Sequence, residues 1–139
     1  MRALGLDVGE RRIGAAVSDP EGILAMPLAA IEARSENEAL ERIEALAREH
    51  DVERVVVGLP LSLDGSLGPQ AQRVKSFADA LAERIELPVV TWDERLSTVA
   101  AGRALADAGV KRGKRKKRLD STAASLILQG YLDRQRGGR

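Results

Sequence analysis

The sequence predicts an α/β fold in which a mixed five-stranded sheet carries helices on both faces. Three short apolar segments open the chain and are joined by tight connections, which is typical of antiparallel strands. Further along, short apolar runs alternate with helical patterns, which indicates parallel strands. With 139 residues, 44% hydrophobic and only 2% aromatic, the chain suits one domain, residues 1–139, with an aliphatic core.

The three opening strands are expected at residues 2–7, 12–18 and 23–31. Between the second and third of these strands, residues 19–22 read Asp-Pro-Glu-Gly. Asp at the first position of a turn, Pro at the second and Gly at the fourth are the residues that a tight β-turn favours. These segments therefore predict an antiparallel meander with the first strand leading into a Gly-containing turn.

The remaining segments show either apolar residues at helical spacing or a short, fully apolar run. Ser35 is a good N-cap, Pro69 suits a first helical turn, and Gly109 suits a helix end. In chain order we expect a helix at 36–50, a strand at 55–57, a loop at 58–68, a helix at 69–85, a strand at 88–92, a helix from 97 or 98 to 108, and a helix at 120–134.

The composition excludes several classes of protein. The chain has no Cys, so disulfides, thiolate metal sites and Cys nucleophiles are excluded. It has no apolar run of about 18 residues and no visible signal peptide. We therefore expect a soluble, cytoplasmic protein that does not bind membranes.

The charge is unevenly distributed along the chain. The net charge is only +1, but one stretch, residues 111–118, is densely cationic, and we call it the basic segment. Without it the rest of the chain sums to about −6, which indicates a polyanionic partner met locally. The basic segment contains no aromatic residue, which favours contact with nucleic-acid phosphates over base stacking. The alternative is that the basic segment is an ordinary solvated loop. The cationic residues of the basic segment are Lys111, Arg112, Lys114, Arg115, Lys116, Lys117 and Arg118.

Three carboxylates stand at the ends of predicted elements. Asp7 ends the first strand, Glu94 follows the fifth strand, and Asp120 opens the last helix on the side of Ala124. If the first and fifth strands lie near each other, the three side chains can converge. Asp93 is set aside because a continuing strand would point it to the opposite face, although a turn there would remove that argument.

Converging carboxylates without His or Cys are typical of a site for Mg²⁺ or Mn²⁺. Two such ions about 4 Å apart can activate water and stabilise the leaving oxygen of a phosphodiester. The alternative is that these acids are solvated, which fits Asp120 better than Asp7. Three cations close by in sequence could bind phosphate or neutralise the acids, namely Arg11, Arg12 and Arg95.

Together these stretches resemble the YqgF/RuvX family, over nearly the whole chain and in the same order. The resemblance implies an RNase H-like fold, with Asp7, Glu94 and Asp120 as metal-binding catalytic acids. It also implies that the basic segment is a substrate-contacting loop. One departure is Ser62, where the family commonly has Asn. The motifs are Gly5-Leu6-Asp7-Val8-Gly9 with Arg12-Ile13-Gly14, Val57-Gly58-Leu59-Pro60 with Asp64-Gly65 and Gly68-Pro69-Gln70, Asp93-Glu94-Arg95-Leu96-Ser97-Thr98, and Asp120 with Ala123-Ala124 and Ile127-Leu128-Gln129.

We therefore expect a divalent-metal-dependent nuclease that acts on structured nucleic acid. Family members are described as nucleases that process the 5′ end of the 16S ribosomal RNA precursor, which is the first choice here, and as Holliday junction resolvases, which is the second. Two interpretations from other classes stay open: a non-catalytic nucleic-acid-binding protein and an actin-like phosphate-binding protein. The protein is expected to be a monomer or a homodimer.

Overall fold

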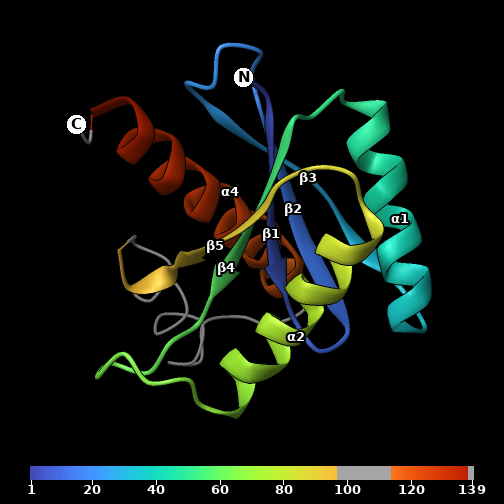
Figure 1. The fold of residues 1–139 in the computed structure, drawn as a ribbon, viewed down its shortest axis with the longest axis vertical. Helices are drawn as coiled ribbons and strands as arrows, with labels where there is room; N and C mark the ends of the chain where they lie inside the picture. The colour runs from blue at the N-terminus through green and yellow to red at the C-terminus, as the bar shows by residue number, and fades with distance from the viewer. Residues whose placement is uncertain (97–113, 138–139) are drawn as a thin grey trace.

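The computed structural model describes residues 1–96 and 114–137, and the side chains of the last helix from residue 122 onward. Five strands form one sheet in the order β3-β2-β1-β4-β5 (Figure 1). β1 pairs antiparallel with β2 and parallel with β4, so the sheet is mixed, as predicted. The strands are β1 (Ala3–Val8), β2 (Arg12–Ser18), β3 (Ala25–Glu32), β4 (Arg54–Leu59) and β5 (Val89–Asp93).

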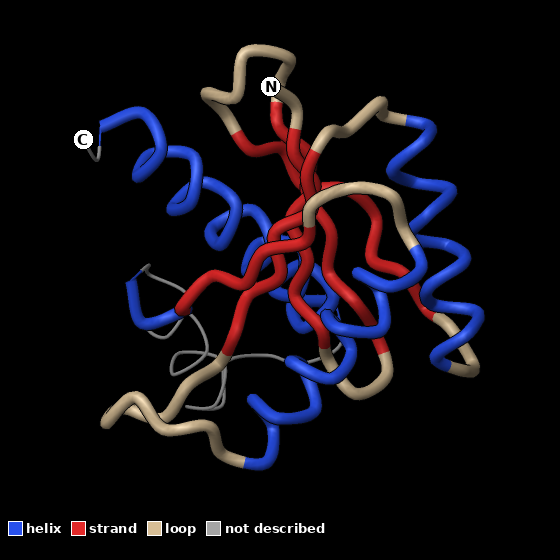
Figure 2. The backbone as a smooth tube through the Cα atoms, in the orientation of Figure 1, coloured by secondary structure: helices blue, strands red, loops and turns tan. Residues whose placement is uncertain are grey.

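Helices cover both faces of this sheet (Figure 2). Two of them, α1 (Glu36–Glu49) and α2 (Pro69–Arg84), lie on one face, and α4 (Lys114–Gly137) crosses the other. A short 3₁₀ turn, η1 (Glu94–Leu96), follows β5 directly. β1 is therefore the central strand of the sheet, with helices above and below it.

The core has two aliphatic layers, one on each side of the sheet, because side chains alternate between faces along a strand. On the face of α1 and α2, Leu4 and Leu6 of β1 are fully buried. On the face of α4, Gly5 has no side chain, and an added Cβ would lie 2.7 Å from Leu128 Cβ. The helix thus packs closely on β1. The buried residues of this second layer are Ala3, Ala16, Val56, Trp92, Ala123, Ala124, Ile127, Leu128, Tyr131 and Leu132.

The predicted start of α1 is confirmed in detail. The Ser35 hydroxyl accepts a hydrogen bond from the Glu38 amide at 3.1 Å, which satisfies an amide that the first helical turn leaves without a partner. Pro69 opens α2, as expected. β4 was predicted at residues 55–57 and extends beyond them at both ends, to Arg54 and Leu59. β5 was predicted at residues 88–92 and ends one residue later, at Asp93.

The turn before β3 is longer than predicted. The Asp19 carboxylate accepts hydrogen bonds from the amides of Ile23 and Leu24 at 2.7 and 2.8 Å, so these two residues belong to the turn. β3 begins at Ala25, not at residue 23. Gln129 of α4 fixes the same turn, because its side chain accepts from the Ala25 amide and donates to the Ile23 carbonyl.

The last helix departs most from the prediction. α4 begins at Lys114, and not near Asp120, so residues 114–118 of the basic segment are helical and the expectation of a loop there was wrong. Lys and Arg have favourable helix propensities, and the cationic stretch therefore extends the helix toward its N-terminus. The predicted helix up to residue 108, together with Lys111 and Arg112, lies outside the described residues.

None of the described helices is long and apolar enough to cross a membrane.

Candidate active site

Asp7 occupies the centre of the sheet, near the carboxyl end of β1, and only 5% of it is exposed. Its partner on β2 is Gly14. On the other side, Leu6 pairs with Val57 of β4, and the next position along that register is Gly58. Both strands beside Asp7 thus present a glycine, which has no side chain, at its level.

Glu94 fills the space over Gly58. A Cβ added to Gly58 would lie 2.9 Å from Glu94 Oε2 and 2.4 Å from Ile127 Cδ1 of α4. Side chains at paired positions of a sheet point to the same face. The Asp7 carboxylate and the Glu94 carboxylate therefore converge on the α4 side of the sheet, one strand apart. Glu94 is also 5% exposed.

The convergence follows from the topology. β1, β4 and β5 are parallel, so their carboxyl ends meet at one edge of the sheet. Asp7 is in β1 and Glu94 directly follows β5, and these two strands are not adjacent because β4 lies between them. The glycine in β4 and the 3₁₀ turn after β5 bring the two acids together across that strand.

The backbone of α4 leads toward this edge. A Cβ on Gly5 would approach Leu128 and the Ala124 carbonyl, whereas the later residue Tyr131 meets Arg54 at the opposite end of β4. The helix therefore runs antiparallel to β1, and its N-terminal turns lie toward the carboxyl end of that strand. Asp120 is in α4, one turn before Ala124. Its side chain lies outside the described part of the chain.

The donor set suits a hard cation. Burial disfavours an isolated carboxylate, but neither Asp7 nor Glu94 is isolated, since each has interactions with other groups. Among the side chains that the structure describes, no three acids or histidines gather closely enough to hold a metal. The described core of the site is thus a pair of carboxylates, with oxygen donors of the kind that Mg²⁺ and Mn²⁺ prefer.

Asp93 and Arg95 form a separate ionic group beside this pair. β5 continues through Asp93, as the exclusion of this residue assumed. The Asp93 carboxylate accepts from Arg95 Nη2 at 2.7 Å and from Arg95 Nε at 3.1 Å. These hydrogen bonds are the main cause that lowers the pKa of Asp93 and raises the pKa of Arg95. The guanidinium of Arg95 is therefore engaged by Asp93, although the residue is exposed.

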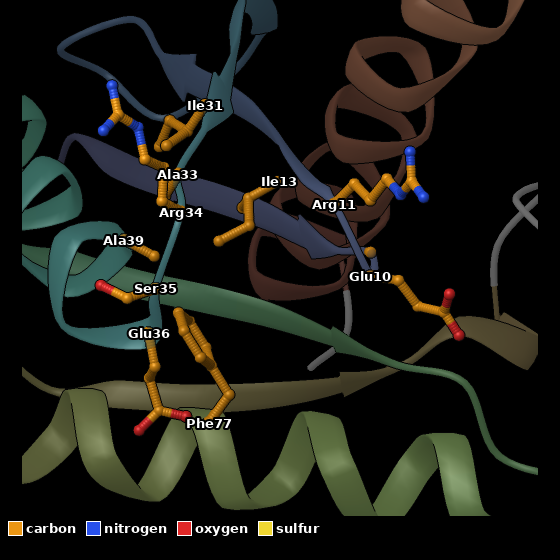
Figure 3. Close-up of a pocket in the computed structure, with 11 residues that line it drawn as sticks. Glu10, Arg11, Ile13, Ile31, Ala33, Arg34, Ser35, Glu36, Ala39 and Phe77 are labelled. Carbon is orange, nitrogen blue, oxygen red and sulfur yellow. The ribbon is translucent and has the colours of Figure 1, made fainter.

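The other two predicted arginines lie at the β1–β2 hairpin. Arg12 begins β2, and strand alternation puts it on the same face as Asp7. Arg11 is exposed in the turn (Figure 3). It lines a cavity of about 290 Å³ whose apolar wall includes Ile13 and Phe77. Since these apolar residues belong to the α1 and α2 side, that cavity is not part of the carboxylate site.

Sequence reasoning did not identify Gly58 as a site residue. Its signal was the step from a fully apolar strand, Val55-Val56-Val57, to a glycine, which was interpreted as the start of a loop. The structure instead includes Gly58 in β4, where the missing side chain makes room for Glu94.

Known proteins are similar to this chain in sequence. A family model described as "RuvX: Holliday junction resolvase" matches residues 1–134. Proteins from Clostridium kluyveri and Desulforamulus reducens, each named "Putative pre-16S rRNA nuclease", are 48% identical to the chain over 134 and 133 residues. Each alignment covers 96% of this chain, and covers 98% and 97% of the respective relative.

Solved structures agree on the fold. Thermus thermophilus RuvC in complex with a Holliday junction substrate superposes with a TM-score of 0.57 at 16% identity, covering 99% of this chain and 97% of RuvC. The fowlpox virus Holliday junction resolvase gives 0.55 at 16% identity, covering 96% of this chain and 99% of the resolvase. The fold is thus RNase H-like, as the resemblance implied, and the chain belongs to the RuvX family.

Proposed function

We propose that this protein is a divalent-metal-dependent nuclease that hydrolyses phosphodiester bonds in structured nucleic acid. The observation that carries the proposal is the convergence of two almost fully buried carboxylates, Asp7 and Glu94, over Gly58 at the carboxyl edge of the sheet. Ligands commonly bind at this edge in sheets of this kind. Membership of the RuvX family supports the same reaction class.

The residues present fit a metal. The Glu94 carboxylate lies over Gly58, with Oε2 2.9 Å from the position that a Cβ would take, and the buried Asp7 carboxylate lies at the neighbouring position of β1, so the two acids can supply the oxygen ligands that such an ion prefers. In this proposal Asp7 and Glu94 hold the metal, with Asp120 as a third ligand from the N-terminal part of α4. When bound, divalent ions at such a site lower the pKa of water and stabilise the leaving oxygen of a phosphodiester.

The chain's own side chains position the substrate. Arg11 and Arg12 stand at the hairpin after β1, where they can hold phosphates close to Asp7. The basic segment supplies a sequence-independent attraction to the nucleic-acid backbone, which salt should weaken. Its helical part adjoins Asp120 in α4.

The first choice of substrate is the precursor of 16S ribosomal RNA, with the protein acting in the cytoplasm. The names of relatives that are 48% identical over nearly their full length support this choice. The second choice is a four-way DNA junction, supported by the description of the family model.

The test is a cleavage panel. Labelled fragments spanning the 5′ end of 16S precursor RNA, single-stranded DNA and four-way junctions are each incubated with Mg²⁺, Mn²⁺ or EDTA. We expect metal-dependent cleavage of the RNA fragment, and Asp120→Asn should remove it. Preferred cleavage of the junction would favour the second substrate, while absence of cleavage of all three polymers with either metal would contradict the proposed activity.

A further inference from the structure

Arg95 connects two segments that flank the carboxylate pair. Its guanidinium forms the bidentate contact with Asp93 described above, and its backbone amide donates to Asp93 Oδ1 at 2.9 Å. From the same side chain, Nη1 donates to the carbonyl of Leu63 at 3.1 Å. One arginine thus joins the end of β5, next to Glu94, to the connection between β4 and α2.

That connection, residues 60–68, has a defined internal structure, and we call it the β4–α2 loop. The Ser62 amide donates to the Ser66 carbonyl at 3.0 Å, and the Gly65 amide donates to the Ser62 carbonyl at 2.8 Å. Gly65 has φ +89°, and an added Cβ would lie 3.3 Å from Arg95 Nη1. The guanidinium therefore lies against the backbone of this turn as well as bonding to it.

The tip of the β4–α2 loop is otherwise open to solvent, since Leu63 is 92% exposed. The loop follows Gly58 and Leu59 directly, so it stands at the edge of the sheet where Asp7 and Glu94 converge. A loop without the Arg95 contact would sample more conformations, and a ligand that touched it would have to order it on binding.

We propose that Arg95 and Asp93 are positioning residues: they form a latch that holds the β4–α2 loop as a fixed wall beside Glu94, and this wall contributes to substrate affinity. The inference rests on the proposed nuclease function. It replaces the sequence-based expectation that Arg95 contacts a phosphate directly. The latch and the direct phosphate contact require different things of Asp93. In a latch, Asp93 helps Arg95 to hold the loop, whereas in a phosphate contact Asp93 would compete with the phosphate for the guanidinium.

Binding in EDTA, with cleavage suppressed, separates the two roles. Dissociation constants for labelled precursor RNA and four-way junction are measured over a salt series, well below the melting temperature of each variant. A latch predicts that Arg95→Ala, Arg95→Lys and Asp93→Asn weaken binding alike, by about three- to ten-fold. The dependence of log K on log salt should stay unchanged. Asp93→Glu, which keeps the carboxylate, should lose less affinity than Asp93→Asn. Arg48→Ala, which removes an exposed charge near the far end of α1, is the matched control.

A direct phosphate contact predicts the opposite pattern. Asp93→Asn would then bind as tightly as the wild type or more tightly, Arg95→Lys would retain affinity, and Arg95→Ala would reduce the salt slope by about 1. That result would overturn the latch.

Hydrogen exchange tests the latch without any nucleic acid. Arg95→Ala and Asp93→Asn should increase amide exchange in residues 60–68 and leave α1 unchanged. Unchanged exchange in that loop would overturn the proposal even if the protein is a nuclease. Faster exchange together with no nucleic-acid binding by the wild type would instead contradict the proposed function and the loop's contribution to affinity.

Discussion

At the scale of single residues, the candidate site depends on a glycine, Gly58, which has no side chain. Gly58 lies in β4, between β1, which carries Asp7, and β5, which Glu94 follows. Because Gly58 has no Cβ, the Glu94 carboxylate can occupy the space above it. The carboxylates themselves could be predicted from the sequence, because Asp7 ends an apolar strand and Glu94 follows one. The role of the glycine between them could not be predicted, since it depends on the strand order and on the contact with Ile127, which belongs to a helix far away in the sequence.

Gly58→Ala should therefore damage both the site and the fold. The new methyl group would lie 2.4 Å from Ile127 Cδ1 and 2.9 Å from Glu94 Oε2, so both must move. We expect the free energy of unfolding in urea to fall by about 1–3 kcal/mol, as overpacking in a core does. If Glu94 holds the metal as proposed, displacing its carboxylate by about 1 Å should lower cleavage by about 100-fold.

A second variant separates these two effects. Shortening Ile127 to Val in the Gly58→Ala background gives the methyl group more space and should recover part of the stability. Cleavage should stay low because the contact with Glu94 remains. Full recovery of cleavage alongside stability would show that the loss in the single variant comes from the clash with Ile127 and not from the contact with Glu94.

At the scale of elements, the largest difference from the sequence prediction is the start of α4. A dense run of Lys and Arg was interpreted as a loop, yet residues 114–118 are helical. The residues favour a helix by propensity, and their mutual repulsion does not prevent it. By contrast, the Ser35 cap was predictable because a local hydrogen bond determines it, and the strands β1 to β3 were predictable because they are short apolar segments joined by tight turns.

The helical conformation determines how the basic segment should be tested. Replacing residues 114–118 by Gln preserves helix propensity while it removes five positive charges. If the segment binds phosphates, RNA affinity should fall, and the dependence of log K on log salt should flatten by about 0.9 for each phosphate that is no longer neutralised. Gln at Arg134 and Arg136, at the other end of the same helix, is the control. An unchanged salt slope in the first variant would indicate that the segment is an ordinary solvated surface.

The turn before β3 provides a pH-dependent test of stability. Hydrogen bonds from the Leu24 and Ile23 amides lower the pKa of Asp19 from its usual value of 3.8. A carboxyl group whose pKa is lowered by folding stabilises the fold above its unfolded pKa, and that contribution is lost as the pH falls through the folded pKa. Asp19→Ala should therefore lower the urea midpoint at neutral pH. The difference from wild type should shrink below pH 3.8, and a difference that is constant with pH would contradict this origin.

At the scale of the whole molecule, the fold brings residues from both ends of the chain to one edge of the sheet. Asp7 comes from the first strand, Glu94 follows the last strand, and α4 crosses the face between them (Figure 1). The α/β class and the mixed sheet followed from the order of the predicted elements. The adjacency of β1 and β4 did not, because the pairing of distant strands is a property of the complete topology.

The oligomeric state bears on the choice of substrate. A four-way junction has two-fold symmetry and is resolved by two paired cuts, which favours a dimer with two active sites. For precursor RNA we expect initial cleavage rates that rise linearly with protein concentration, together with a monomeric mass in sedimentation. A quadratic dependence on concentration would favour the junction substrate.

In the proposed mechanism, Asp7 anchors the divalent metal of a phosphodiester site. The direct test compares Asp7→Asn with the wild type on the polymer that the wild type cuts, measuring cleavage in Mg²⁺ and binding in EDTA. Asp79→Asn, an exposed carboxylate on α2, is the control. We predict that Asp7→Asn loses cleavage by about 10³-fold or more and still binds the substrate. Cleavage by Asp7→Asn at the wild-type rate would show that Asp7 does not anchor the metal.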